Sequence, residues 1–172
     1  MSLLILDAAA FVEKLADLPL VKCHAGENVL TAGSTTGRLM VLKSGAVEVV
    51  REGVQIAKVS APGAVFGELA VLLDQPHTAD VRTLEQSEFH VADAPTLLAG
   101  EPTVALYVAA ILAQRLNSAN RALVEIKRQL RAGEPRIVIG RTVEKVEVLL
   151  SSASLVYAGY PNDPFEASGL QA

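Results

Sequence analysis

The sequence predicts a mainly β fold with flanking helices: a jelly-roll-like β-roll followed by a long C-terminal helix. Glycines recur over residues 20–93 and separate short segments rich in β-branched and aliphatic residues, which is typical of an all-β sandwich or barrel. Residues 102–132 then continue without a helix breaker. With 172 residues, of which 51% are hydrophobic and 20% charged, the chain can bury one core and carry accessory elements.

A short amphipathic helix is expected at residues 7–17, before the strands. Asp7 is a candidate N-cap, and Phe11, Val12 and Leu15 share one face. The beginning of the chain has no basic region, and charged residues interrupt its apolar ones. We therefore expect a cytoplasmic protein, and no signal peptide.

Two hairpins are expected within the β region. The segments on either side of Glu52-Gly53 should pair, because a two-residue loop of this kind suits a tight hairpin turn. "TADVRTL" and "SEFHVAD" are expected to form a second hairpin around Glu85-Gln86.

The long helix at residues 102–132 would be a rod of roughly 45 Å. Pro102 suits its first turn, and Gly133 suits the position after its last turn. Apolar residues follow alternating steps of four and three along it: Leu112, Leu116, Ala119, Leu123, Ile126 and Leu130. This seam either lies on the helix's own domain or pairs with a second chain. The seam is narrow and the helix is polar after Gln114, so we expect a homodimer.

We assign residues 1–133 to one domain and residues 134–172 to a tail of undefined role, with at most one further short helix in "RTVEKVEVLLSS". The net charge of −4 argues against a surface devoted to nucleic acid or anionic lipid. A single cysteine, Cys23, fits a reducing compartment, and no apolar run approaches the roughly 18 residues of a membrane helix.

The stretch "FGELAVLLDQPHTADV", residues 66–81, has the composition of an anion site. Gly67 allows a tight turn and close approach of a ligand, and the N–H groups of a helical first turn after it have no intrahelical partner. Glu68 would repel a phosphate but could accept a hydrogen bond from a sugar hydroxyl. Ala79 is small enough to let another N–H group reach a ligand. An ordinary loop can show the same pattern.

This stretch resembles the phosphate-binding cassette of the cyclic nucleotide-binding domain family, and the wider resemblance covers roughly residues 11–130. The cassette positions that match are Phe66, Gly67, Glu68, Leu69, Ala70, Leu72, Pro76, Thr78 and Ala79. The resemblance implies a β-roll, with a long helix after it as in regulators similar to the catabolite activator protein.

The resemblance also implies roles for the cassette residues. Backbone N–H groups would bind a cyclic phosphate, and they belong to Gly67, Leu69, Ala70 and Ala79. Glu68 would hold the ribose 2′-OH, Thr78 would face the nucleotide, and Phe66 would begin the ligand-binding stretch.

His77 departs from the family pattern, which has a phosphate-neutralising arginine at this position. A histidine is shorter, cannot form a bidentate fork and is only partly charged near neutral pH. Losing one charge-assisted hydrogen bond weakens binding by about ten- to over a hundred-fold. Arg82 is near in the sequence, but it is expected to point to the opposite face of its strand.

These observations predict a non-enzymatic regulatory module that binds cAMP or cGMP and signals through a paired long helix to a downstream protein. The alternative is a dimeric interaction scaffold with a degenerate site, a binder of another ligand, or a regulator of transcription acting through a partner. Direct DNA binding is not expected, because no recognition-helix pattern follows Gly133. No cofactor and no metal are expected, since Cys23, His24, His77 and His90 lack metal-ligand spacing.

Overall fold

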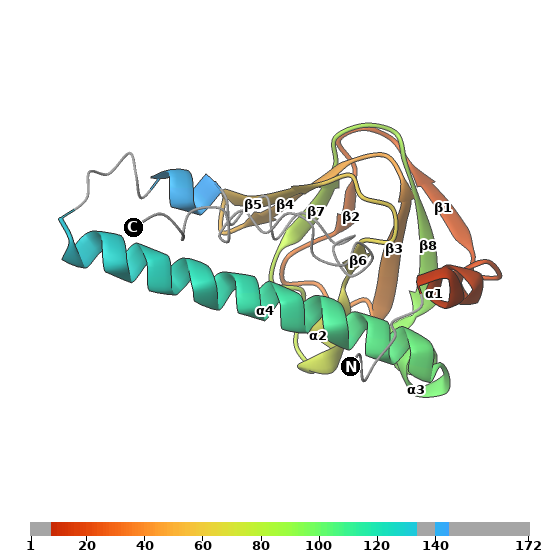
Figure 1. The fold of residues 1–172 in the computed structure, drawn as a ribbon. Helices are drawn as coiled ribbons and strands as arrows, with labels where there is room; N and C mark the ends of the chain where they lie inside the picture. Colours follow the sequence, from red (N-terminus) through yellow and green to blue (C-terminus); the bar gives the residue numbers. More distant parts are fainter. Residues whose placement is uncertain (1–7, 134–139, 145–172) are drawn as a thin grey trace.

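Two four-stranded antiparallel sheets form the centre of the protein (Figure 1). The computed structural model describes residues 8–133 and 140–144. The first sheet has the strand order β1-β8-β3-β6 and the second has the order β2-β7-β4-β5. The strands are β1 (Leu20–Cys23), β2 (Asn28–Leu30), β3 (Arg38–Ser44), β4 (Val47–Arg51), β5 (Val54–Val59), β6 (Val65–Phe66), β7 (Asp80–Thr83) and β8 (Ser87–Asp93). The predicted β-roll is confirmed.

Helices cover one face of the first sheet and continue beyond it (Figure 1). They are α1 (Ala8–Leu15), α2 (Glu68–Leu72), α3 (Ala94–Gly100) and α4 (Pro102–Arg131). The long helix therefore has almost the predicted bounds, and Gly133 follows it with the positive φ of 70° that a glycine tolerates best. Residues 140–144 are also helical, and the remainder of the expected tail helix lies outside the described residues.

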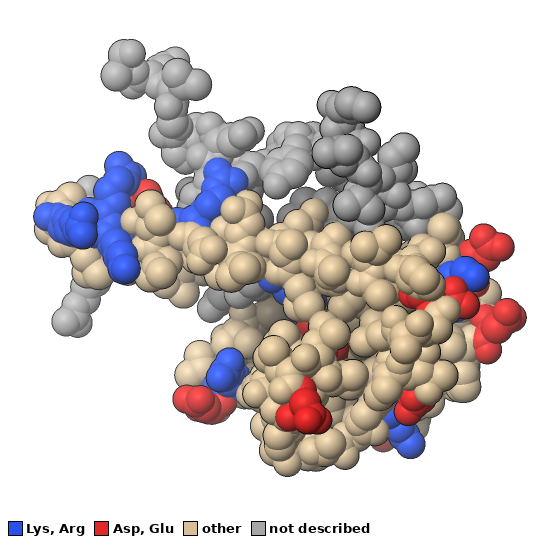
Figure 2. Space-filling model, turned by 90° about the horizontal axis from the view of Figure 1, so that it is seen from below, with Lys and Arg blue, Asp and Glu red and all other residues tan. Residues whose placement is uncertain are grey.

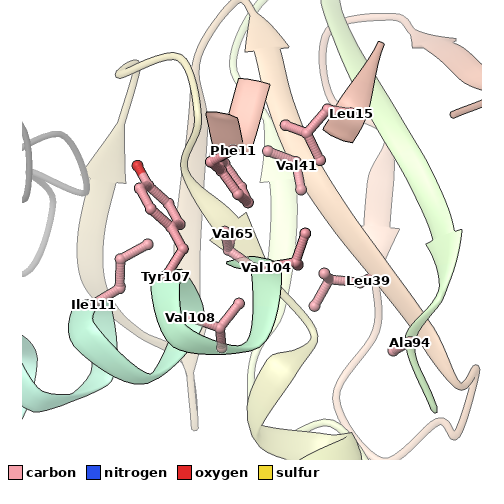
Figure 3. Close-up of a cluster of buried hydrophobic side chains, with 10 residues drawn as sticks. All are labelled: Phe11, Leu15, Leu39, Val41, Val65, Ala94, Val104, Tyr107, Val108 and Ile111. Carbon is pink, nitrogen blue, oxygen red and sulfur yellow. The ribbon is translucent and has the colours of Figure 1, made fainter. Parts of the chain in front are cut away.

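Strand β3 separates two hydrophobic cores, because its side chains alternate between them. Leu39 and Val41 point to the core under the helices, which Figure 3 shows, whereas Met40 and Leu42 point to the core between the two sheets. A strand covered on both faces carries a continuous apolar run, and "LMVL" is that run.

The core under the helices joins α1 to α4. The Phe11 and Tyr107 rings stack with their centroids 3.7 Å apart and their planes 11° from parallel (Figure 3). Phe11 is fully buried and Leu15 is 3% exposed, as the expected face requires. The prediction that Val12 shares this face is wrong, since Val12 is 59% exposed. Each residue turns the helix by about 100°, so the Val12 side chain points away from the face that Phe11 and Leu15 share. The expected N-cap, Asp7, lies outside the described residues.

The first expected hairpin is confirmed, and the second is wrong. Strands β4 and β5 pair around Glu52 and Gly53, whose φ angles of 53° and 78° suit a two-residue hairpin turn. Strands β7 and β8 lie in different sheets: β7 pairs with β2 and β4, and β8 pairs with β1 and β3. The chain crosses between the sheets at residues 84–86, where the Leu84 N–H donates to the Ala46 carbonyl at 2.8 Å. Each of these two strands therefore pairs with strands that are distant in the sequence, and not with the other.

Helix α3 was not predicted, although its start carries a recognisable signal. The Asp93 carboxylate accepts a hydrogen bond from the Thr96 N–H at 3.0 Å, and a proline lies in the first turn. This short helix turns the chain from β8 into α4, and the two helices meet at an angle of 107°. No single helix among the described residues is long and apolar enough to cross a membrane, and α3 and α4 reach that composition only as this bent pair.

The two halves of α4 have different surroundings. Val104, Val108 and Ile111 are buried in the core, and the seam residue Leu112 packs against it. Further along, the seam residues Leu116, Leu123 and Leu130 are 63%, 50% and 61% exposed, Ala119 is also exposed, and Ile126 is half-buried. Figure 2 shows basic side chains at the C-terminal end of α4 and a mainly uncharged surface along its middle. Among the described residues, the seam packs against the hydrophobic core at its start, through Leu112.

Replacing Phe11 by alanine should lower the free energy of unfolding by about 3–5 kcal/mol, because it leaves a cavity against Tyr107 in the core. Val12→Ala on the same helix is the matched control and should change it by less than about 0.5 kcal/mol. Chemical denaturation measures both values. Equal losses for the two variants would contradict the packing of α1 against α4.

Candidate functional site

A cavity of about 240 Å³ lies between the second sheet, α2 and α4. All eight residues predicted to bind a ligand line it: Phe66, Gly67, Glu68, Leu69, Ala70, His77, Thr78 and Ala79. They come from two segments, residues 66–70 and 77–79, which the loop after α2 brings back to the same cavity. The residues predicted to bind a ligand therefore lie at one cavity, and their contact with a ligand stays a prediction.

Gly67 is required by the backbone at the beginning of α2. Its φ is 90°, in the left-handed region, and a Cβ atom there would clash with the carbonyl oxygen of Arg38. It is the N-cap of α2, and no side chain caps the helix at that end. The cavity wall is therefore formed here by backbone, with first-turn N–H groups left for other partners.

Glu68 is buried and forms an ion pair with Arg115 of α4. Its side chain is 5% exposed, and Arg115 Nη1 lies 2.8 Å from Glu68 Oε1. Arg115 Nη2 also donates to the Val65 carbonyl at 3.4 Å. Burial raises the pKa of Glu68 above its ordinary value of 4.5, and the charge and hydrogen bond of Arg115 act against this increase. The pair ties the cassette to the long helix.

Arg115 is the residue that the sequence interpretation missed. It lines the cavity and is one of two arginines that do so; the other is Arg51 at the end of β4. In the sequence it is one of several polar residues in the middle of a long helix, and nothing local distinguishes it from its neighbours. Only the packing of α4 against β6 and α2 places it here.

His77 is held by the loop before β3 and is not a free cation. Its residue is 6% exposed, and its Nε2 forms a hydrogen bond of 2.8 Å with the Thr36 hydroxyl. Its backbone N–H donates to the Ser34 carbonyl, and its carbonyl accepts from the Gly33 N–H. Burial lowers the pKa of His77 below 6.5, so the imidazole is neutral near neutral pH in the protein without a ligand.

Arg82 does not take the place of the absent arginine. Its guanidinium pairs with Glu48 of β4 through Nε at 2.8 Å, and it is not among the residues that line the cavity. Its neighbour Val81 lines the cavity instead, as the alternation of side chains along β7 requires. The expectation for Arg82 is confirmed.

The remaining wall of the cavity is apolar and comes from the strands. Leu30, Val65 and Val81 contribute to it, together with Val49, Ile56, Ala57 and Val59 from the β4–β5 hairpin. An apolar cavity with a few convergent polar groups is typical of a small-molecule site. Among the described residues, no three side chains of the His, Cys, Asp and Glu types are grouped to hold a metal ion.

Residues 20–99, a little less than half of the chain, match the family model described as the cyclic nucleotide-binding domain. The chain is 38% identical over 76 residues to a cAMP-dependent protein kinase regulatory subunit of Yarrowia lipolytica, which covers 44% of this chain and 20% of that protein. It is 36% identical over 92 residues to the cGMP-dependent protein kinase egl-4 of Caenorhabditis briggsae, which covers 48% of this chain and 12% of that protein. The chain thus spans a fifth or less of the length of these relatives.

The structure is also similar to the catabolite activator protein of Thermus thermophilus. The TM-score is 0.59 at 22% identity, and the similarity covers 90% of this chain and 88% of that one. This likeness concerns the fold, which agrees with the β-roll and long helix expected from the sequence.

Replacing Arg115 by glutamine should destabilise the protein in a pH-dependent way. At pH 7 it leaves a buried carboxylate without its cation, which costs about 3–5 kcal/mol. Below pH 4.5 Glu68 is protonated in both the folded and unfolded states, so the loss should be smaller and should grow as pH rises through the raised pKa of Glu68. Thermal unfolding at several pH values measures this.

Lys127→Gln removes the same charge from an exposed position of α4 and is the control for the Arg115 variant. It should change stability little at any of these pH values. A loss for Arg115→Gln that is the same at pH 4.5 and pH 7 would show that the guanidinium acts by packing alone.

Proposed function

Because residues 20–99 belong to the cyclic nucleotide-binding domain family, we propose that this chain is a regulatory module that binds cAMP or cGMP. The observation that carries the proposal is that all eight predicted ligand residues line one cavity. We propose further that the module has no catalytic activity and works in the cytoplasm, in keeping with its single free cysteine, Cys23.

In this proposal the cyclic phosphate binds to backbone N–H groups of the cassette, and Arg115 neutralises the Glu68 carboxylate beside it. Gly67 contributes backbone alone to the cavity wall. His77 contributes little charge, since burial lowers its pKa and disfavours the imidazolium. Arg115 is fully charged at all ordinary pH values and lines the same cavity. Its charge is matched by that of Glu68, so it keeps the carboxylate from repelling the phosphate but does not replace the arginine expected at position 77.

Glu68 is proposed to accept a hydrogen bond from the ribose 2′-OH while it keeps its ion pair with Arg115. A carboxylate has two oxygens and about four acceptor positions, and Arg115 uses Oε1. Because Arg115 belongs to α4, a ligand that contacts Glu68 acts on both partners of this pair. The site is thereby connected to the helix that would carry the signal to a downstream protein.

A second candidate function is a dimeric scaffold whose nucleotide site has decayed. Buried, neutral His77 favours it, because the expected cation is absent from the position next to the cassette. The scaffold and the nucleotide module differ in one measurable property, which is whether a cyclic nucleotide binds.

Calorimetric titration of the ligand-free chain should show saturable binding of cAMP, cGMP or both. The 2′-deoxy analogue of the nucleotide that binds should do so about ten- to a hundred-fold more weakly, because Glu68 then loses a charge-assisted hydrogen bond. Absence of binding for both nucleotides would favour the scaffold. Equal affinity for the ribose and 2′-deoxy forms would mean that Glu68 serves Arg115 and does not contact the sugar.

The exposed seam of α4 is proposed to pair with the same helix of a second chain. Leu116, Leu123 and Leu130 recur every seven residues and are at least half exposed in the single chain. An uncharged stripe with this spacing is typical of a coiled-coil dimer. A symmetric pair would cover the seam of both copies at once.

The double substitution Leu116→Glu and Leu123→Glu should convert a dimer into a folded monomer, because unpaired carboxylates would be buried in the interface. Light scattering should give about twice the chain mass of 18.1 kDa for the unmodified protein and 18.1 kDa for the variant. Val124→Glu is the control, since Val124 is 66% exposed on α4 but lies off the seam, and it should remain dimeric. An unmodified protein of 18.1 kDa would contradict the proposal.

A further inference from the structure

The cavity has two chemically different parts. One part is formed by the cassette and Arg115, and it contains the Glu68 carboxylate, the Thr78 hydroxyl and the Gly67 backbone. The other part is the inner face of the β4–β5 hairpin, where Val49, Ile56 and Ala57 form an apolar wall. If phosphate and ribose occupy the cassette, as the proposed function requires, the purine base occupies the space beside the hairpin.

Arg51 is the hydrogen-bonding side chain of that second part. Among the cavity-lining residues outside the cassette, Arg51 and Arg115 are the two with polar side chains, and Arg115 is already bound to Glu68 and to the Val65 carbonyl. Arg51 follows Val49 by two residues on β4, so both side chains face the cavity.

The guanidinium of Arg51 has donors to spare. Among the described residues its ion-pair partner is Glu52, whose Oε1 is 3.9 Å from Arg51 Nε, a distance too long for a hydrogen bond. Glu52 is itself 86% exposed and the Arg51 side chain is 54% exposed, so their attraction is weak. Arg51 can therefore turn its donors toward a ligand at little cost.

A guanidinium distinguishes the two purines because it has five donors and no acceptor. Guanine presents two adjacent acceptors, O6 and N7, and an arginine can bind both at once. Adenine presents N7 as an acceptor but a donor amino group at C6, which faces the guanidinium unfavourably. From this chemistry we propose that Arg51 reads the O6/N7 edge of the base and makes the site selective for cGMP over cAMP, an inference that rests on the proposed function.

The test compares four nucleotides by calorimetric titration of the full chain: cGMP, cAMP, inosine 3′,5′-cyclic monophosphate and 7-deaza-cGMP. We expect cGMP to bind about tenfold more tightly than cAMP. The inosine nucleotide keeps O6 and N7 but lacks the 2-amino group, so it should bind like cGMP. The 7-deaza analogue loses one acceptor, so its affinity should lie between those of cGMP and cAMP.

The Arg51→Met variant keeps the apolar stem and removes all donors. It should abolish the preference for cGMP and leave the affinity for cAMP within about twofold. Arg131→Met makes the same change at the exposed end of α4, away from the cavity, and should keep the preference. Because Arg51 is more than half exposed, its replacement should leave the melting temperature nearly unchanged.

The outcomes separate this inference from the proposed function. Binding of cAMP as tight as that of cGMP, or an equal loss of both in Arg51→Met, would overturn the role of Arg51 and leave the nucleotide site standing. An inosine nucleotide that binds like cAMP would also overturn it, since selectivity would then come from the 2-amino group. If no cyclic nucleotide binds, both the site and the inference are wrong.

Discussion

The buried ion pair between Glu68 and Arg115 connects the wall of the cavity to the long helix α4. Glu68 stands at the first turn of α2, in the wall of the cavity, and Arg115 stands in the middle of α4. A carboxylate that is 5% exposed needs a cation or a proton, so α4 must lie where Arg115 can reach it. The core around Phe11 and Tyr107 fixes the first half of the same helix against the β-roll. Apolar packing in this core and the ion pair with Glu68 together hold α4 beside the cavity.

The charges around the cavity explain why an absent arginine at position 77 does not make the site acidic. His77 is neutral and bonded to Thr36, and Glu68 is balanced by Arg115. Arg51 adds a further positive charge at the hairpin. The cavity therefore carries an excess of positive charge that comes from strand and helix residues far from the cassette in the sequence, which is compatible with an anionic ligand.

The two errors in the sequence-based prediction of the fold have different physical causes. Strands β7 and β8 looked like a hairpin because they are close in sequence, yet each pairs with strands from elsewhere in the chain. Val12 looked like a core residue because it is apolar, yet the turn of the helix exposes it. For the strands, local patterns compete with contacts between distant segments, and burial of the larger apolar surface decides between them. For Val12, the step of about 100° per residue turns the side chain away from the face that Phe11 and Leu15 share.

The sequence by itself determined the β-roll, the β4–β5 hairpin, the bounds of the long helix and the wall of the cavity formed by residues 66–70 and 77–79. The hairpin turn and the helix ends are local, because glycines with positive φ, two-residue turns and helix ends depend on neighbouring residues. The β-roll and the cavity wall were predicted from the resemblance to a known family. Only the tertiary structure decided the strand order, the partner of Glu68 and the surroundings of Arg51. A guanidinium on a helix or a strand looks the same in any sequence window, and its role depends on which distant residues the fold brings within hydrogen-bonding distance of it.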